Sequence, residues 1–260
     1  MEQLCLDTGG HPSIDSCCIG ANDYPNLCLV GACGCSPDTS ESTKVCDCVG
    51  SNNCFDSEFG CVDKSLWMNC EDNGGYLDTQ GTCNGDPFPT TCLAKGEVGG
   101  PFDCYPGIDT TVCACSRSAL CYVQGVGCVA SDEAGLCLAS GGEIIVRAAC
   151  NGVRSMPTTC LAKNEVGGPF DCGSTSNMQP TCECPGSKCF VQGVGCVESK
   201  KAGECLIDDG EIQLDSCCKM SGDFPDICSN GACSCSDSDS VDTAICSCPY
   251  GGCWDGRKCR

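Results

Sequence analysis

Cysteine is the residue type with the most chemistry to offer in this chain, at 36 of 260 residues. That fraction exceeds the roughly 8–10% at which a secreted disulfide scaffold becomes the leading interpretation. The rival chemistry is thiolate metal binding, and zinc ribbons need the repeated spacing C-x2-C. No C-x2-C pair occurs, and the even count allows every cysteine to be paired. We therefore predict structural disulfides throughout, formed in an oxidising compartment.

The cysteines form four sets that return at steps of 65, 67 and 68 residues, counted from the first cysteine of each set. Each set holds an even number, so each is able to close its own bridges. The predicted structural disulfide cysteines are Cys5, Cys17, Cys18, Cys28, Cys33, Cys35, Cys46, Cys48, Cys54 and Cys61; Cys70, Cys83, Cys92, Cys104, Cys113, Cys115, Cys121 and Cys128; Cys137, Cys150, Cys160, Cys172, Cys182, Cys184, Cys189 and Cys196; and Cys205, Cys217, Cys218, Cys228, Cys233, Cys235, Cys246, Cys248, Cys253 and Cys259.

The sets are of two kinds, in the order A-B-B-A. The outer sets share Asp-Ser-Cys-Cys, and the inner sets share a nearly identical stretch at 90–104 and 158–172. We predict a small disulfide-rich fold of four tandem modules, made of short antiparallel β-hairpins and loops with little helix. The predicted modules, called repeats 1 to 4 below, are A at 1–64 with ten cysteines, B at 65–131 and B at 132–199 with eight each, and A at 200–260 with ten.

Few of the other residues are candidates for a catalytic role. The only histidine, His11, lies in Gly-Gly-His-Pro and has no counterpart in the other repeats. We expect it in a surface loop, outside any Ser–His or Cys–His system. Carboxylates are plentiful, but acid–base catalysis needs a cleft with unequal environments, which small modules seldom supply. We expect no enzymatic activity and no catalytic residues.

Calcium is the one ligand that the acidic loops suggest. Asp237-Ser-Asp239-Ser-Val-Asp242 looks like the start of an oxygen-ligand loop. It lacks the glycine of the sixth position, and Cys248 stands where the twelfth position needs glutamate. We expect no metal site and no cofactor, with weak Ca²⁺ binding by the acidic loops as the alternative.

The formal net charge of −21 opposes binding to nucleic acid and to anionic membrane surfaces. No run of about 18 apolar residues suggests membrane insertion. The expected partners are proteins, through self-association or in a larger complex. The start of the chain lacks a leader pattern, so any signal peptide would already be removed. We expect an extracellular or secreted protein; the alternative is an oxidising organelle lumen such as the thylakoid lumen.

The charge is uneven along the chain. Residues 1–69, 70–136, 137–204 and 205–260 carry −8, −7, 0 and −6. Sequence divergence is the simpler interpretation, and a contact face in repeat 3 is the alternative.

Two short patterns must position the cysteines. An apolar residue precedes Pro-x-x-Cys in all four repeats, and proline restricts the residue before it to extended geometry. We predict stiff turns that direct this side chain into the core, with anchors at Tyr24, Phe88, Met156 and Phe224. Aromatic residues also follow one cysteine of each repeat directly. Packing against a disulfide explains them better than a carbohydrate-binding stripe does, and these anchors are Phe55, Tyr122, Phe190 and Trp254.

Each repeat contains one C-x-C pair near its end. Alternate residues of a strand face the same side, so both sulfurs should point one way. The following cysteine–aromatic segment is the predicted hairpin partner of this strand, and Gly-Val-Gly is predicted to supply a turn or a bulge. Glu143–Cys150 is predicted to be a strand. The joints between repeats at 62–69, 129–136 and 197–204 are short and polar, which favours close stacking of the repeats over free tethering. The A modules gain one bridge, from Cys17 to Cys33 or Cys35 and from Cys217 to Cys233 or Cys235.

These observations favour a non-enzymatic structural protein. It would be a subunit of an extracellular filament, coat or matrix, or an accessory subunit of a larger assembly in an oxidising lumen. The alternative is a secreted binding module such as a multi-headed protease inhibitor. Its reactive loops would be Leu93–Asp103 and Leu161–Asp171, where Lys95 and Lys163 match and permit a trypsin-like target.

Overall fold

The computed structural model describes residues 1–29, 31–93, 100–104, 106–149, 156–161, 177–229 and 231–260. The chain divides into two compact units. Unit 1 comprises Met1–Thr90 and Pro101–Arg117, and unit 2 comprises Thr91–Gly100 and Ser118–Arg260. The boundary crosses repeat 2, and each unit is described by itself.

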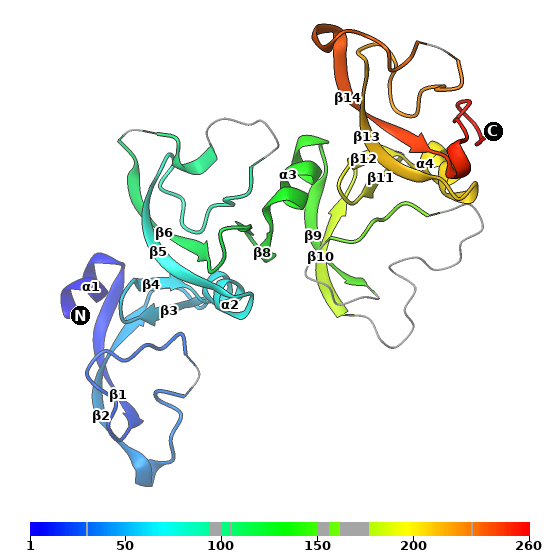
Figure 1. Ribbon diagram of the computed structural model, residues 1–260. Coiled ribbons are helices and arrows are strands. Elements are labelled where there is room, and N and C mark those ends of the chain that lie inside the picture. The colour runs from blue at the N-terminus through cyan, green and yellow to red at the C-terminus, as the bar shows by residue number, and fades with distance from the viewer. Residues whose placement is uncertain (30, 94–99, 105, 150–155, 162–176, 230) are drawn as a thin grey trace. The chain divides into compact units, whose positions relative to one another are not determined.

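The same series of elements recurs along the chain: a helix, a long antiparallel strand pair and a short hairpin (Figure 1). Unit 1 holds α1 (Glu2–Asp7), β1 (Gly10–Cys18), β2 (Ser40–Cys48), β3 (Asn53–Asp56), β4 (Gly60–Asp63), α2 (Lys64–Asp72), β5 (Gly75–Thr82) and β6 (Ile108–Cys115). Unit 2 holds β7 (Leu120–Val123), β8 (Gly127–Ala130), α3 (Ser131–Ala139), β9 (Glu143–Ala149), β10 (Asn177–Glu183), β11 (Lys188–Val191), β12 (Gly195–Glu198), α4 (Ser199–Ile207), β13 (Glu211–Cys218) and β14 (Ser240–Ser247).

Two-stranded antiparallel sheets, 17 disulfides and 20% helix confirm the predicted class of small cysteine-rich β-hairpin modules. In the fourth repeat the short hairpin is reduced to a single bridge between Trp254 and Cys259. Short 3-10 turns at Pro37–Thr39, Gly100–Phe102, Asp237–Asp239 and Pro249–Gly251 complete the elements. None of the described helices is both long and apolar enough to span a membrane.

The C-x-C strands do not pair with the cysteine–aromatic segments, so that prediction is wrong. β2 pairs instead with β1, the strand that follows the helix, with Gly10 opposite Cys48. The cysteine–aromatic segments fold back on themselves, as β7 does with β8. The Val126 N–H donates to the Val123 carbonyl, and Gly125 and Gly127 have φ of +78° and +109°. The Gly-Val-Gly stretch therefore supplies the turn, as predicted. The predicted strand at 143–150 is β9, which ends at Ala149.

One pairing pattern explains why the strand after the helix lies beside C-x-C. The helix cysteine bonds the first C-x-C cysteine, and the second C-x-C cysteine bonds the last cysteine of the repeat. The described bonds of these two kinds are Cys5–Cys46, Cys70–Cys113, Cys137–Cys182, Cys205–Cys246, Cys48–Cys61, Cys184–Cys196 and Cys248–Cys259. The chain leaving the helix is thus held against the C-x-C strand.

A third kind of bond joins the Pro-x-x-Cys turn to the cysteine before the aromatic anchor: Cys28–Cys54, Cys92–Cys121, Cys160–Cys189 and Cys228–Cys253. The two cysteines that flank a short hairpin therefore bond elsewhere and not to each other. The A modules add Cys17–Cys33, one of the two predicted alternatives, beside Cys18–Cys35, and repeat both as Cys217–Cys233 and Cys218–Cys235. Repeat 2 has the single bond Cys83–Cys104 in this region.

The first two kinds of bond meet in one sulfur cluster per repeat. Cys46 Sγ lies 3.8 Å from Cys61 Sγ, and Cys182 Sγ lies 3.8 Å from Cys196 Sγ. The two C-x-C sulfurs of repeat 3, of Cys182 and Cys184, are 4.0 Å apart and so face one side, as predicted. A glycine at the start of the long strand lies under each cluster. A Cβ at Gly142 would stand 2.6 Å from Cys182 Sγ, and one at Gly210 would stand 2.6 Å from Cys246 Sγ. Only glycine leaves room for the sulfurs at this close approach.

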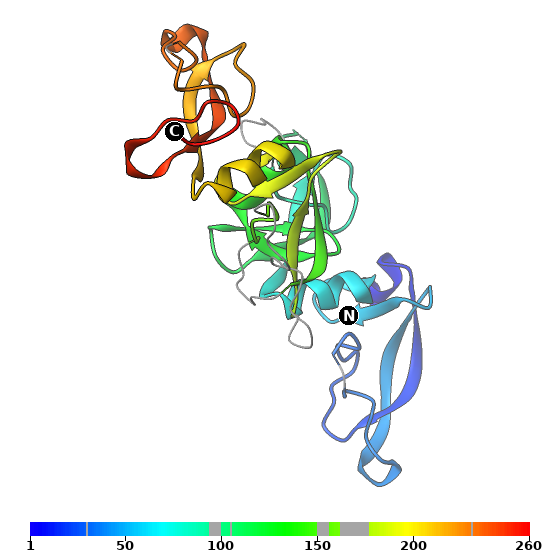
Figure 2. The ribbon, with the colours of Figure 1, turned by 90° about the vertical axis from the view of Figure 1, so that its right-hand side faces the viewer.

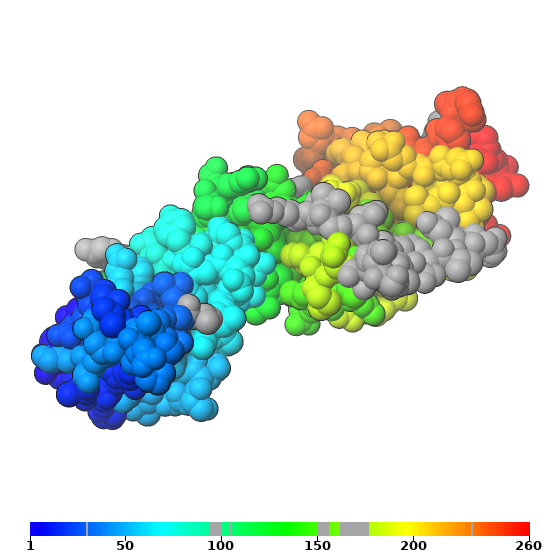
Figure 3. All heavy atoms as spheres, turned by 90° about the horizontal axis from the view of Figure 1, so that it is seen from below, coloured from blue at the N-terminus to red at the C-terminus, as the bar shows by residue number. Residues whose placement is uncertain are grey.

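The joints between repeats contain most of a helix each, which the sequence pattern does not predict. α2, α3 and α4 follow β4, β8 and β12 without an intervening residue. Their sequences have little helical periodicity, and α3 and α4 each contain a glycine. These helices are below the length at which isolated helices persist, and a disulfide ties each of them to its C-x-C strand. A side-chain N-cap is present in α2 alone of the three, at Asp63. α4 lies beside β13 (Figure 2), and α2 contacts β4. Within unit 1, the blue spheres of repeat 1 continue without a break into the cyan spheres at the start of repeat 2 (Figure 3).

In repeats 1, 2 and 4 the residue before proline is not extended, in contrast to the prediction. Tyr24, Phe88 and Phe224 have φ of +58°, +52° and +54°. Their N–H groups donate to carbonyls of the C-x-C strands, at Lys44, Thr111 and Ala244 respectively, over 2.7–2.8 Å. The unusual conformation turns each ring into the core, where burial offsets a backbone cost of about 1–3 kcal/mol.

We expect Gly10→Ala to destabilise the protein by about 1–3 kcal/mol through overpacking. Its methyl group would lie 2.8 Å from Cys5 Sγ and 2.9 Å from Cys61 Sγ. Gly34→Ala is the matched control in the same repeat, because its Cβ would meet only the Gly31 Cα atom, at 3.8 Å. The measurement is urea unfolding of the oxidised proteins. Equal stability of the two variants would contradict the role of the glycine.

The Asp63 carboxylate caps α2, where its Oδ1 accepts the N–H groups of Ser65 at 2.8 Å and Leu66 at 3.0 Å. Burial raises the pKa of Asp63, but hydrogen bonds from Ser65, Leu66 and Asn52 outweigh it and hold the pKa below its ordinary value. We expect Asp63→Ala to cost about 1 kcal/mol at neutral pH. Because the folded pKa is lowered, the carboxylate's contribution is present above its unfolded pKa and is lost as pH falls through the folded value.

Asp63→Asn is the control for this prediction, since asparagine also caps helices. Chemical unfolding from pH 7 to pH 2 should show the gap between wild type and Asp63→Ala closing in acid. A gap that stays constant over this range would exclude the ionised cap.

Candidate functional site

The cysteines offer no reactive thiol in the part of the chain that the structure describes. All of them are disulfide-bonded there, including Cys115 and Cys128. The groups of three close ligand atoms in these ranges are cysteine trios from the sulfur clusters, such as Cys46, Cys48 and Cys61. Their sulfurs are in disulfides and are not thiolate ligands. Cys150 and Cys172 lie outside the described residues.

The other candidates for chemistry lie apart from any cluster of ligand atoms among the described residues. His11 is exposed, but it lies in strand β1 and not in the expected loop. Of the acidic stretch at 237–242, Asp237 and Asp239 lie in a 3-10 turn, whereas Asp242 lies in β14. Asp239 accepts hydroxyl hydrogen bonds from Ser236 and Ser238.

The eight aromatic and apolar anchors are all buried. Phe55, Tyr122, Phe190 and Trp254 are 0% exposed, and Tyr24, Phe88, Met156 and Phe224 are 1–6% exposed. A shared contact positions the first four. Their carbonyls accept an N–H from the segment after each Pro turn, donated by Leu27, Thr91, Thr159 and Ile227 at 2.7–2.8 Å. The anchors therefore form the cores and offer no stripe on the surface.

Sequence reasoning missed a recurring link between the helix and the closing cysteine. The Thr8, Ser140 and Asp208 side chains follow their helices and accept the N–H of Cys61, Cys196 and Cys259 at 2.8–2.9 Å. The signal was available as a polar residue three positions after each helix cysteine.

Two equivalent hollows lie in unit 2, where α3 and α4 begin. The first, of about 370 Å³, is lined by Leu93, Ser131, Gly135 and Leu136 among others. The second, of about 250 Å³, is lined by Leu161, Ser199, Gly203 and Glu204 among others. The leucine follows the Pro-turn cysteine in each case, and the helix glycine stands at the same position relative to the helix cysteine.

Unit 1 has a different and larger cavity beside Leu29, the matching leucine. We call it the Trp67 groove, after one wall. It has about 530 Å³ and opens on another face of the helix, with Trp67 and Glu71 of α2 and Tyr76 of β5. Asp56, Glu58 and Phe59 of the β3–β4 hairpin line the opposite side. Met68 stands where α3 and α4 have glycine, and it is 41% exposed.

The buried carboxylate of Asp56 organises the Trp67 groove. Oδ1 accepts the N–H groups of Glu58 at 2.9 Å and Phe59 at 3.2 Å. Oδ2 accepts the Trp67 indole N–H at 3.1 Å and the Asn26 amide at 2.6 Å. These four donors hold an anion that is only 6% exposed without any basic residue in the lining. Burial, then the charges of Asp56 and Asp72, raise the pKa of the neighbouring Glu71 above its ordinary value.

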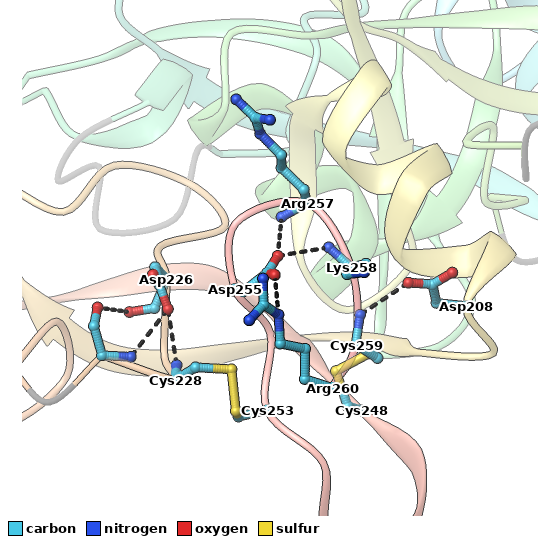
Figure 4. A network of polar contacts seen from close by, with 11 residues as sticks. Asp208, Asp226, Cys228, Cys248, Cys253, Asp255, Arg257, Lys258, Cys259 and Arg260 are labelled. Atoms are coloured by element: carbon cyan, nitrogen blue, oxygen red, sulfur yellow. Dashed lines mark hydrogen bonds and ion pairs between the residues drawn. A yellow bond between two sulfur atoms is a disulfide. The ribbon is translucent and has the colours of Figure 1, made fainter.

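The last turn of the chain in repeat 4 is built around the equivalent aspartate (Figure 4). Asp255 accepts the N–H groups of Arg257 and Lys258, each at 3.0 Å, and is paired with Arg260 Nε. The backbone hydrogen bonds, and to a smaller extent Arg260, hold the pKa of Asp255 below its ordinary value. Arg260 thus binds the carboxylate whose counterpart in unit 1 binds Trp67.

Comparison with known proteins places no relative beside this chain, because no family model, curated protein or solved structure matches it. Function must therefore be argued from the surfaces described above. Most of the predicted inhibitor loops, with Lys95 and Lys163, lies outside the described residues.

We expect Glu71→Gln to raise the melting temperature at pH 7. Because the folded pKa of Glu71 is raised, its protonated form favours folding below the ordinary value of 4.5, and this stability is lost as pH rises through the folded pKa. Removing the charge of Glu71 should raise the melting temperature at neutral pH and leave it unchanged near pH 3. Exposed Glu183→Gln is the control, and thermal scans across pH 3–8 are the measurement. A gain independent of pH would refute the electrostatic cause.

Proposed function

We propose that this protein is a non-enzymatic structural subunit of an extracellular filament, coat or matrix, or an accessory subunit of a larger assembly in an oxidising lumen. The dense disulfides are typical of extracellular and other oxidising environments. They make each module rigid without a large core. Rigid surfaces lose little conformational entropy on association.

A single observation carries the proposal: an exposed leucine follows the Pro-turn cysteine beside a hollow in three successive repeats. Leu29, Leu93 and Leu161 are 56%, 37% and 38% exposed. Each borders a cavity at a point where one repeat runs into the helix of the next. Burying each leucine against a partner would contribute about 1.5–3 kcal/mol. A periodic set of such positions supports assembly better than a single ligand pocket does.

The test is the mass of the native oxidised protein by sedimentation velocity, with electron microscopy of the same sample. We expect oligomers that grow with concentration, or a stable complex in the native source. The triple variant Leu29→Ser, Leu93→Ser, Leu161→Ser should weaken association at least about tenfold. Ile14→Ser, which removes an equally large residue that is 74% exposed and lines none of these cavities, should not. A monomer at all concentrations and without a partner in native extract would contradict the proposal.

A further inference from the structure

The last turn of the chain carries a basic tip on an acidic protein. Three of the four basic residues of 205–260 are Arg257, Lys258 and Arg260. Arg257 and Lys258 are exposed, and their bonds to Asp255 use backbone N–H groups only. The Arg257 side chain points away from Asp255 (Figure 4). Within the described ranges no ion pair joins the Arg257 or Lys258 side chain to a carboxylate. Two cationic groups are therefore presented to solvent, and Arg260 is kept by Asp255.

The turn that presents this tip is rigid. Cys228–Cys253 and Cys248–Cys259 tie both of its sides to repeat 4. Cys253 and Arg260 exchange two backbone hydrogen bonds, of 3.0 and 2.9 Å. The Cys259 N–H also donates to Asp208 at 2.8 Å. The backbone beneath Arg257 and Lys258 is thus already ordered, so an interaction there loses less entropy than one made by a free tail.

The Trp67 groove has the complementary chemistry. Its accessible groups are the carboxylates of Glu58 and Glu71 and the ring of Tyr76, over a wall formed by Asp56 and Trp67, which are 6% and 8% exposed. Tyr76 is 50% exposed, and Glu58 and Glu71 are exposed. Aromatic faces and carboxylates together favour the guanidinium group of arginine, which stacks and forms ion pairs at once. The hollows beside Leu93 and Leu161 lack this combination, since one acidic residue lines each and Lys200 lines the second.

We propose that the Arg257–Lys258 tip of one copy inserts into the Trp67 groove of a second copy. This inference rests on the proposed assembly function and names the two surfaces that join. The tip and the groove are different surfaces of the same chain, so the contact is heterologous. Each added copy presents a new groove and a new tip, and such contacts generate open chains unless the rotation closes a ring.

The net charge of −21 is the main obstacle to self-association, and this contact reduces it by pairing opposite charges. Copies of like charge repel each other at long range, and a local pairing of opposite charges selects the one approach that is favourable. Exposed ion pairs are individually weak, so most of the affinity must come from stacking of the Arg257 guanidinium on Tyr76, while Glu58 and Glu71 select the orientation of the tip. Salt screens both the repulsion and the pairing, with a Debye length of about 8 Å at physiological ionic strength.

The test reverses charges on each surface and then mixes the variants. Arg257→Glu with Lys258→Glu gives an acidic tip, and Glu58→Lys with Glu71→Lys gives a basic groove. Each variant alone pairs like charges, so we expect its self-association to weaken at least about tenfold. In a mixture, acidic tips meet basic grooves and native tips meet native grooves, so assembly should return. A chain with all four changes should assemble alone.

Matched controls change the net charge equally at exposed sites elsewhere. Lys44→Glu with Lys188→Glu matches the tip variant, and Glu183→Lys with Glu211→Lys matches the groove variant. The readout is mass by sedimentation velocity, after melting curves show that each variant is folded. The inference would be overturned if both charge-reversed variants self-associated as strongly as the wild type, or if their mixture did not regain the mass of the wild-type assembly. Either result would leave the proposed assembly function standing. Wild-type protein that stays monomeric but has another partner in native extract would overturn this inference alone, and a monomer without any partner would overturn both.

Discussion

Two disulfides that meet above one glycine are the contact on which each described repeat depends. One bond ties the helix to the C-x-C strand and the other ties that strand to the closing hairpin, so three elements are joined at one point. The bonds from the helix close loops spanning 41–45 residues. If a disulfide acts by lowering the entropy of the unfolded chain, each such bond raises the free energy of unfolding by about 4 kcal/mol. The two disulfides can lie this close together only because the residue beside them is glycine, since any side chain there would displace the sulfurs.

This covalent core explains features that a hydrophobic core would not permit. Helices of only six to nine residues persist, with glycine inside two of them. Three aromatic anchors, Tyr24, Phe88 and Phe224, keep a strained backbone. Surface composition is then free to vary, since little of it is needed for folding. Equivalent positions accordingly differ in chemistry: Asp56 is buried under Trp67, whereas Asp255 holds Arg260 and a basic tip.

The sequence was sufficient to predict the fold class, because cysteine count and spacing are direct evidence of cross-linked small modules. The glycine turns of the short hairpins and the strand at 143–149 could be predicted because they depend on the conformational preferences of the residues within them. The helices at 64–72, 131–139 and 199–207 could not be found this way, because each is short and is held by a disulfide to a strand more than 40 residues away in the sequence. The strand pairing was also mispredicted, since it depends on which cysteines bond over more than 40 residues. The candidate surfaces could not be predicted, because the sequence does not show that Leu29 borders a cavity or that Arg257 lies on a rigid turn. Both facts depend on tertiary structure.

Disulfide mapping of the native protein tests the central role of the sulfur clusters most directly. Digestion without reduction, followed by partial reduction, alkylation and mass spectrometry, identifies each linked pair. The account predicts Cys5–Cys46 with Cys48–Cys61, and the same crossing pattern in repeat 4 as Cys205–Cys246 with Cys248–Cys259. Bonds within the short hairpins, such as Cys54–Cys61 or Cys253–Cys259, would contradict it, because Cys48 and Cys248 would then lose their partners and the C-x-C strand would no longer be tied to the closing hairpin.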